Sequence, residues 1–247
     1  MKGRFMESHT NLKGKAAIVT GASRGIGRAI ALALAREGVK LMLAARDQLR
    51  LQRVAEEARQ YSVEADSVSA DMRDEAQIKN MIEAALKRFG RLDILVNNAG
   101  LGYFKPVSDL STAEWDEMFG VNLRGVFLAT REALPHLREA GESFVVNVAS
   151  LAGKNTFANG AGYTATKWGL RAFAQCLMLE ERKNGLRVLT ICPGSVATDF
   201  GAGPSREQRA EKRNIIMPED VADGILAALK LPQRSMISEI DIRPSNP

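Results

Sequence analysis

Seven apolar runs of strand length recur along the chain, and longer amphipathic stretches separate them. The runs cover residues 16–20, 40–45, 64–70, 92–97, 143–149, 186–191 and 236–242. Several are apolar throughout, which is typical of strands that helices cover on both faces of a parallel sheet. In the intervening stretches apolar residues repeat at helical spacing, as Ile26, Ile30 and Leu34 do. The pattern predicts an α/β fold with a doubly wound parallel sheet.

Length and composition fit one globular domain. At 247 residues the chain can bury one sizeable core, and its 45% hydrophobic and 26% charged residues are ordinary values. We expect a basic N-terminal tail at residues 1–11 and a single domain at residues 12–247. No run is long enough to span a membrane, and the N-terminus lacks the apolar stretch of a signal peptide. A cytoplasmic protein with no membrane partner is therefore expected.

The chain carries 34 basic and 29 acidic residues, a net charge of +5, and much of the excess lies near the N-terminus. The other basic cluster, at residues 205–213, is interpreted as a solvated loop. Because no basic stripe is interleaved with aromatic residues, we expect no nucleic-acid partner. Cys176 and Cys192 are expected to be buried free thiols, and His9 and His136 lie too far apart to suggest a metal site.

Unusual residues follow six of the predicted strands, each within two residues of the strand end. They are Gly21, Arg46, Asp71, Asn98, Ser150 and Pro193. The carboxyl ends of parallel strands lie along one edge of the sheet, which is where ligands bind in open α/β folds. These residues are therefore predicted to converge on one crevice.

The first strand leads into TGASRGIG, in which Gly21, Gly25 and Gly27 precede a predicted helix. Glycines at such a turn let backbone amides approach a pyrophosphate, and the helix N-terminus supplies unpaired donors. A dinucleotide is implied. The alternative is a tight turn whose glycines serve only close packing.

The end of the second strand distinguishes two dinucleotides. An acid there accepts from the ribose 2′-hydroxyl of NAD, whereas a cation meets the 2′-phosphate of NADP. Here Arg46 follows Ala45, and Arg24 lies in the glycine turn, so NADP is favoured. Asp47 argues for NAD, but its position before a helical stretch suits an N-cap, and NAD stays the alternative.

Tyr163 and Lys167 lie four residues apart in YTATK and so share a helix face. A free tyrosine, with a pKa of about 10, exchanges protons poorly at pH 7, and we expect the Lys167 ammonium to lower that pKa by favouring phenolate. Ser150 can hydrogen-bond a substrate oxygen while Tyr163 donates a proton as hydride arrives from a nicotinamide. The alternative is an ordinary helix pair with Ser150 as a cap.

The motifs occur in the order TGASRGIG, NNAG at 97–100, Ser150, YTATK and PGSVAT at 193–198. In that order and spacing the chain resembles the short-chain dehydrogenase/reductase family from about residue 12 to its end. The resemblance implies a seven-stranded Rossmann-like sheet and the catalytic set Asn122, Ser150, Tyr163 and Lys167. Asn122 would hold a water in a proton relay with Lys167, which would also bind the nicotinamide ribose. From its position alone, Asn122 is predicted to be an exposed helix residue.

The resemblance also implies cofactor contacts. Asp71 would meet the adenine, with an N-cap role as the alternative, and Asn97 is expected to tie strands together. Thr198 would meet the nicotinamide carboxamide, with a capped turn as the alternative. The residues expected to contact the cofactor are Gly21, Ser23, Arg24, Gly25, Ile26, Gly27, Arg46, Asp71, Met72, Asn98, Ala99, Gly100, Tyr163, Lys167, Pro193, Gly194, Val196 and Thr198.

The resulting hypothesis is an NADP-dependent oxidoreductase that interconverts a ketone or aldehyde with an alcohol. A 3-oxoacyl-[acyl-carrier-protein] reductase is the alternative, although the ending EIDIRPSNP lacks the glycines common in that subgroup. A non-catalytic dinucleotide-binding protein is a further alternative. Residues at about 198–217 occupy the place of the family's short substrate loop.

Family members are usually dimers or tetramers, so a homodimer or homotetramer is expected. Trp115, Phe119 and Phe127 can serve such an interface, but core burial is the expected fate of most of them.

Overall fold

All seven predicted strands are present in the computed structural model, which describes residues 9–200 and 215–245. They are β1 (Ala16–Thr20), β2 (Lys40–Ala45), β3 (Ala65–Ser69), β4 (Ile94–Asn97), β5 (Ser143–Val148), β6 (Leu186–Pro193) and β7 (Glu239–Ile242). They form one sheet in the order β3-β2-β1-β4-β5-β6-β7, and every neighbouring pair runs parallel. The predicted doubly wound sheet is confirmed. Most of the predicted substrate loop, residues 201–214, lies outside the described residues.

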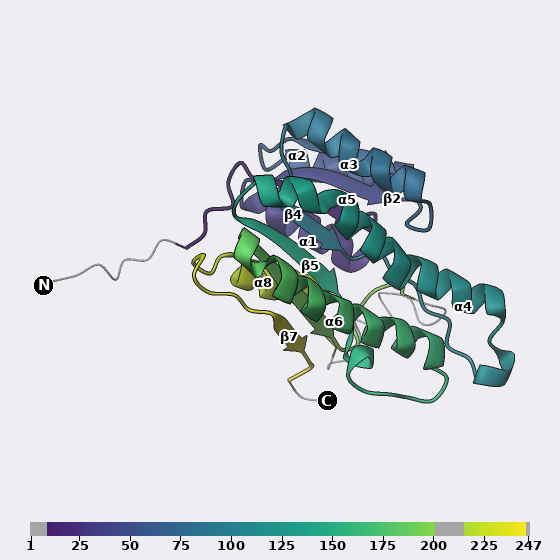
Figure 1. Cartoon of the computed structure of the whole chain (residues 1–247). Coiled ribbons are helices and arrows are strands. Elements are labelled where there is room, and N and C mark those ends of the chain that lie inside the picture. The colour runs from purple at the N-terminus through teal and green to yellow at the C-terminus, as the bar shows by residue number, and fades with distance from the viewer. Residues whose placement is uncertain (1–8, 201–214, 246–247) are drawn as a thin grey trace, which may run out of the picture.

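Helices cover both faces of the sheet (Figure 1). On one face lie α1 (Gly25–Arg36), α2 (Gln48–Arg59) and α8 (Pro218–Leu229). On the other lie α3 (Glu75–Phe89), α5 (Gly125–Glu139) and α6 (Ala161–Glu181), with α4 (Thr112–Phe119) against α6. The short helical turns are η1 (Val107–Asp109), η2 (Gly120–Arg124), η3 (Leu151–Gly153) and η4 (Arg182–Asn184).

Strand β1 shows why the apolar runs are continuous. Its side chains alternate between the two faces, with Ala17 and Val19 in the core beneath α1 and Ala16 and Ile18 in the core beneath α3 and α5. Because both faces are buried, both sets must be apolar, and β1 is completely buried.

The strand order reverses at β1. The chain builds β2 and β3 outward on one side of β1 and then returns to place β4 on its other side. In a doubly wound sheet the loops beyond the carboxyl ends of the strands part at this reversal and leave a crevice. The predicted ligand site therefore has a defined place, above the ends of β1 and β4.

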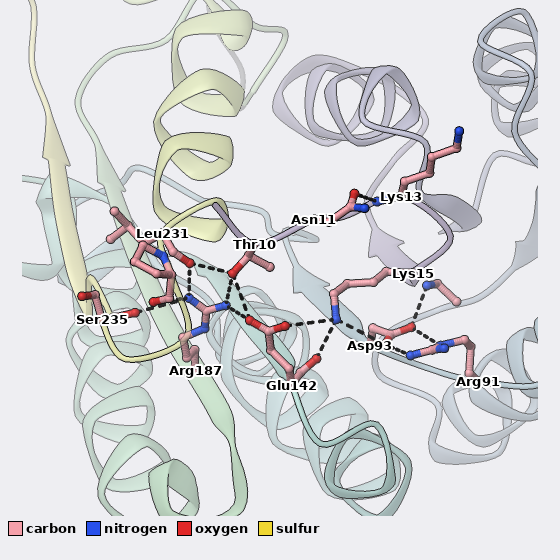
Figure 2. A network of polar contacts seen from close by, with 12 residues as sticks. Thr10, Asn11, Lys13, Lys15, Arg91, Asp93, Glu142, Arg187, Leu231 and Ser235 are labelled. Atoms are coloured by element: carbon pink, nitrogen blue, oxygen red, sulfur yellow. Dashed lines mark hydrogen bonds and ion pairs between the residues drawn. The ribbon is translucent and has the colours of Figure 1, made fainter. Parts of the chain in front are cut away.

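The opposite edge of the sheet is tied together by buried ionic contacts (Figure 2). Arg187, near the start of β6 and 8% exposed at its side chain, donates to the Glu142 carboxylate at 2.6 Å and to the Leu231 carbonyl at 2.8 Å. Arg187 also donates to the Thr10 hydroxyl at 3.0 Å, and the Lys15 ammonium lies 3.8 Å from Glu142. This network joins the N-terminal segment, including Thr10 within the predicted tail, to the starts of β1, β5 and β6.

Two smaller expectations have outcomes here. Cys192 is a buried free thiol as predicted, but Cys176 is exposed, because it lies on the outer face of α6. Within residues 9–200 and 215–245 no helix is long and apolar enough to cross a membrane. The same residues contain no cluster of His, Cys, Asp and Glu that could hold a metal.

Arg187→Ala should lower the free energy of unfolding by roughly 3 kcal/mol, because it leaves the partly buried Glu142 carboxylate without its closest cation. Urea denaturation measures the change. Arg53→Ala, on an exposed position of α2, is the matched control and should have no measurable effect. Equal stability of the two variants would contradict a structural role for the network.

Candidate functional site

A cleft of about 1230 Å³ opens at the carboxyl edge of the sheet. Segments that follow β1 to β6 line it, as the strand-end pattern predicted. All of the predicted site residues line this cleft except Asn122, which lies behind its wall.

The glycine turn between β1 and α1 forms the floor at the point where the strand order reverses. Gly21 and Gly25 have φ values of +64° and +56°, which side chains rarely adopt. A Cβ at Gly27 would lie 2.3 Å from the Gly21 carbonyl oxygen and 2.4 Å from the Asn98 amide nitrogen. No side chain caps the start of α1, because Arg24 is extended and makes no cap hydrogen bond. The turn therefore presents bare backbone and uncapped helix amides to the cleft.

Asn98 supports this turn from behind. Its side-chain amide donates to the carbonyl oxygens of Thr20 at 2.9 Å and Gly21 at 3.2 Å. The Thr20 hydroxyl accepts from the backbone amides of Asn98 and Ala99, at 3.0 and 3.1 Å. Sequence reasoning missed Thr20, although a hydroxyl residue that ends a buried strand beside the glycine turn was the available signal. Asn97 ties strands together as expected, with its amide 3.0 Å from the Asn147 oxygen on β5.

Two basic side chains line the cleft, Arg46 directly after β2 and Arg24 in the glycine turn. Arg46 is 66% exposed at its side chain and lies 3.9 Å from Glu117, and Arg24 lies 3.8 Å from Asp199. Asp47 is the N-cap of α2, because its carboxylate accepts from the Arg50 amide at 3.0 Å. The N-cap interpretation of Asp47 is therefore confirmed.

Asp71 also lines the cleft, but its N-cap alternative is wrong. The cap of α3 is Asp74, whose carboxylate accepts from the Ala76 and Gln77 amides. Asp71 instead accepts from the Arg73 guanidinium, with Nη2 at 2.6 Å, and this hydrogen bond lowers the pKa of Asp71. Asp71 is thus a carboxylate fixed beside the cleft by its own neighbour.

Asn122 is fully buried, which corrects the prediction of an exposed helix residue. It lies on the π-helical turn η2, where its carboxamide pairs with the backbone of Leu101, accepting at 2.9 Å and donating at 2.8 Å. It also donates to the Thr166 hydroxyl at 3.1 Å. Gly100 allows this approach, since a Cβ there would lie 3.3 Å from the Asn122 oxygen and 3.6 Å from the Lys167 nitrogen. The signal available in the sequence was an apolar residue, Met118, four positions before Asn122 and therefore on the same helix face; Met118 is also buried.

Tyr163 and Lys167 lie together on α6 beneath the cleft, 8% and 4% exposed. The Lys167 ammonium donates to the Val148 carbonyl at 2.9 Å and lies 5.7 Å from the centre of the Tyr163 ring. Ser150 follows β5, and its hydroxyl accepts from the Ala152 amide at 3.1 Å. Thr166 donates to the Tyr163 carbonyl at 2.7 Å and so links Tyr163 to Asn122. Sequence reasoning missed Thr166.

The expected lowering of the Tyr163 pKa is wrong for this structure. Burial raises the pKa of Tyr163 to about 12, and a side-chain hydrogen bond with Ser150 opposes that rise only in part. Burial also lowers the pKa of Lys167 to about 8. The physical reason is that removal from water disfavours phenolate and ammonium alike, so it opposes the ionisation of both groups.

The segment after β6 closes the cleft on the side of α1. The Gly194 amide donates to the Ile242 carbonyl on β7 at 2.9 Å. Thr198 is 8% exposed, and its methyl group would lie 3.1 Å from a Cβ at Gly25. Residues 193–198 therefore pack across the glycine turn, with Pro193, Gly194, Val196 and Thr198 lining the cleft.

A family model described as short chain dehydrogenase matches residues 15–209. The chain therefore belongs to the short-chain dehydrogenase family of oxidoreductases. It is similar to an uncharacterized oxidoreductase of Staphylococcus aureus strain USA300, with 36% identity over 235 residues that cover 95% of this chain and 99% of the relative.

Two solved structures have the same fold. One is an alcohol dehydrogenase from the archaeon Thermococcus sibiricus complexed with 5-hydroxy-NADP, with 35% identity and a TM-score of 0.86, covering 94% of this chain and 97% of that one. The other is a 3-ketoacyl-(acyl-carrier-protein) reductase from Brucella melitensis complexed with NADH, with 34% identity and a TM-score of 0.85, covering 95% and 98%.

Lys167→Met should change how stability depends on pH. The folded pKa of Lys167 is about 8 and the ordinary value is 10.5, so between these values the unfolded chain binds a proton that the folded chain lacks. The free energy of unfolding therefore gains a contribution that rises with pH across this window, and the variant lacks it. Denaturant titrations of both proteins from pH 7 to pH 10 measure the difference.

The comparison ends at pH 10 because above the ordinary lysine pKa of 10.5 the unfolded chain also loses this proton and the difference levels off. A wild-type minus variant difference that stays flat or falls between pH 8 and pH 10 would contradict burial of an ammonium at Lys167.

Proposed function

We propose that the chain is an NADP-dependent reductase that converts a ketone or aldehyde to an alcohol. The observation that carries this proposal is the placement of the Tyr163 phenol and the Ser150 hydroxyl in a cleft whose floor is the glycine turn. A proton donor and a hydrogen-bond donor then border the cleft that the turn suits to a dinucleotide.

The residues present fit a dinucleotide. A side chain at Gly21 or Gly27 would collide with Asn98, Ala99 or the Gly21 carbonyl, so the glycines let the turn pack closely against the segment after β4. The uncapped amides at the start of α1 would then donate to a pyrophosphate. Gly21, Ser23 and Ile26 would hold the pyrophosphate end, Asp71 and Ala99 the adenosine, and Gly194 and Thr198 the nicotinamide. When bound, the reduced nicotinamide supplies the hydride.

Side chains of this chain would bind and protonate the carbonyl oxygen of the substrate. Ser150 would donate a hydrogen bond to it, and Tyr163 would give it the proton that completes the alcohol. Burial raises the pKa of Tyr163 to about 12, so the phenol is protonated at neutral pH, as an ordinary tyrosine is, and would give its proton only to the strongly basic alkoxide that forms as hydride arrives. Lys167, which is buried, would return a proton to the phenol between turnovers through a water held by Asn122.

Tyr163→Phe should reduce kcat by about 10² to 10⁴ fold, because it removes the proton donor and leaves the ring packing in place. Binding of NADPH, measured by calorimetry, should stay within threefold of wild type. Retained binding with lost turnover also excludes the non-catalytic dinucleotide-binding alternative, whereas an unchanged rate would remove Tyr163 from the mechanism.

NADP is favoured over NAD because Arg46, which follows β2, and Arg24 in the glycine turn line the cleft, while the Asp47 carboxylate caps α2. The solved relatives were complexed with 5-hydroxy-NADP in one case and NADH in the other. Arg46→Ala should therefore weaken NADPH binding by about tenfold or more and leave NADH binding unchanged. Calorimetry with both dinucleotides tests this, with Arg53→Ala as control, and tighter NADH binding by the wild type would contradict it.

A 3-oxoacyl-[acyl-carrier-protein] reductase is the second candidate. It is favoured by the likeness to the Brucella melitensis enzyme, over 95% of this chain. An NADPH oxidation screen across β-ketoacyl thioesters, ketoesters, diketones and aldehydes separates the two functions, because the second candidate requires the thioesters to be the best substrates.

We also propose that the chain forms a homodimer or homotetramer. Trp115 on α4 and Phe127 on α5 are 38% and 44% exposed, which corrects the expectation that most of Trp115, Phe119 and Phe127 are in the core. Trp168 on α6 is a further exposed aromatic residue, at 47%. Phe119 is partly exposed and stacks on Trp115, with 4.6 Å between ring centres. Large apolar side chains grouped on neighbouring helices are typical of an interface.

Sedimentation should give a mass of at least two chains of 26.9 kDa each, and Phe127→Glu should shift the protein toward the monomer. Leu49→Glu, at an exposed apolar residue on α2, is the matched control. A monomeric wild type at micromolar concentration would contradict the assembly.

A further inference from the structure

We infer that the substrate carries an aromatic ring, or a planar unsaturated group of similar size, beside its carbonyl. The inference rests on the carbonyl reductase activity proposed above. It follows from three phenylalanines, Phe104, Phe157 and Phe200, which line the cleft around Tyr163 and are called the aromatic wall below.

The rings of the aromatic wall meet one another and the proposed proton donor at angles. Phe104 lies 5.4 Å from Tyr163 with its plane at 69°, and Phe200 lies 5.6 Å from Tyr163 at 55°. Phe104 is 6.0 Å from Phe157 at 41° and 6.5 Å from Phe200 at 61°. Tilted and edge-to-face pairs are the geometry that aromatic rings prefer, so a further ring can join the cluster in the same way.

The backbone holds two of these rings in place. A Cβ at Gly160 would lie 2.5 Å from the Phe157 ring, and a Cβ at Gly102 would lie 2.8 Å from the Phe104 ring. Asn159, between Phe157 and Gly160, has a φ of +67°, a conformation that non-glycine residues rarely adopt. The Phe157 ring therefore packs directly against the backbone of Gly160, and the turn at Asn159 holds it in a defined position beside the cleft.

The aromatic wall leaves apolar surface exposed at the cleft. Phe104 is 41% exposed although its ring contacts the buried Tyr163, and Phe157, which contacts Phe104, is 48% exposed. Leu151 and Ala152 extend the apolar lining next to Ser150. A planar apolar group attached to a carbonyl held at Ser150 and Tyr163 would remove this surface from water and complete the ring cluster.

Three methyl ketones test the inference: acetophenone, cyclohexyl methyl ketone and acetone. The wild type should reduce acetophenone with a kcat/KM about tenfold or more above that for cyclohexyl methyl ketone, which has a saturated ring of the same size. Phe157→Ala should lower kcat/KM for acetophenone about tenfold and that for acetone less than threefold, and Phe157→Leu should behave like Phe157→Ala.

Val107→Ala is the matched control. Val107 is 75% exposed and lines a separate apolar groove that Phe157 also borders, but it does not line the cleft. It should leave all three rates unchanged. Equal rates for the phenyl and cyclohexyl ketones in the wild type, or an equal loss for all three ketones in Phe157→Ala, would overturn the inference.

A binding measurement keeps the inference testable apart from turnover. Calorimetry on the protein saturated with NADP should show 1-phenylethanol binding about tenfold more tightly than 1-cyclohexylethanol, and Phe157→Ala should remove that preference. If no carbonyl is reduced, the proposed function fails while this preference still decides for or against the aromatic wall. Equal affinity for the two alcohols would overturn the inference even if ketones are turned over.

Discussion

Burial of a phenol and an amine side by side at the edge of the sheet is the constraint on which the site depends. Tyr163 and Lys167 are both nearly inaccessible, and removal from water costs each of them its charged form. Such groups need polar partners, and the Val148 carbonyl on β5 accepts from Lys167 while the Ser150 hydroxyl meets the phenol. Thr166, which accepts from the Asn122 carboxamide, donates to the backbone carbonyl of Tyr163 and so ties the π-helical turn to α6. The end of β5, the π-helical turn and the start of α6 are therefore fixed relative to one another by the same groups that would carry the chemistry.

Structural contacts lie at the amino ends of the strands, and the candidate site lies at their carboxyl ends. At the amino edge, Arg187 and Glu142 join the starts of the strands through contacts whose purpose is structural. At the carboxyl edge, glycines replace side chains, so that the turn after β1, the Asn98 amide and the Thr198 loop can approach within contact distance. The ionic contacts stabilise the amino ends of the strands, while the glycine turns that border the cleft lie at the carboxyl ends. Binding sites are commonly carried in this way on loops of a rigid scaffold.

Much of this arrangement could be predicted from the sequence because its signals are local. Strands buried on both faces are continuous apolar runs, and strand ends in a parallel sheet must meet, so Gly21, Arg46, Ser150 and Pro193 could be brought to one cleft without coordinates. The fold assignment gained further from five ordered motifs. The apolar runs, the strand ends and the short motifs are each determined by residues that are neighbours in the chain.

The features that sequence reasoning missed depend on distant partners. Asn122 is buried because the backbone of Leu101, 21 residues earlier, satisfies both ends of its carboxamide. The spacing of Tyr163 and Lys167 predicts a lowered pKa for Tyr163, but burial raises that pKa and only the Ser150 hydrogen bond opposes the rise. Burial is set by the packing of the whole fold, which the spacing of two residues along one helix does not report.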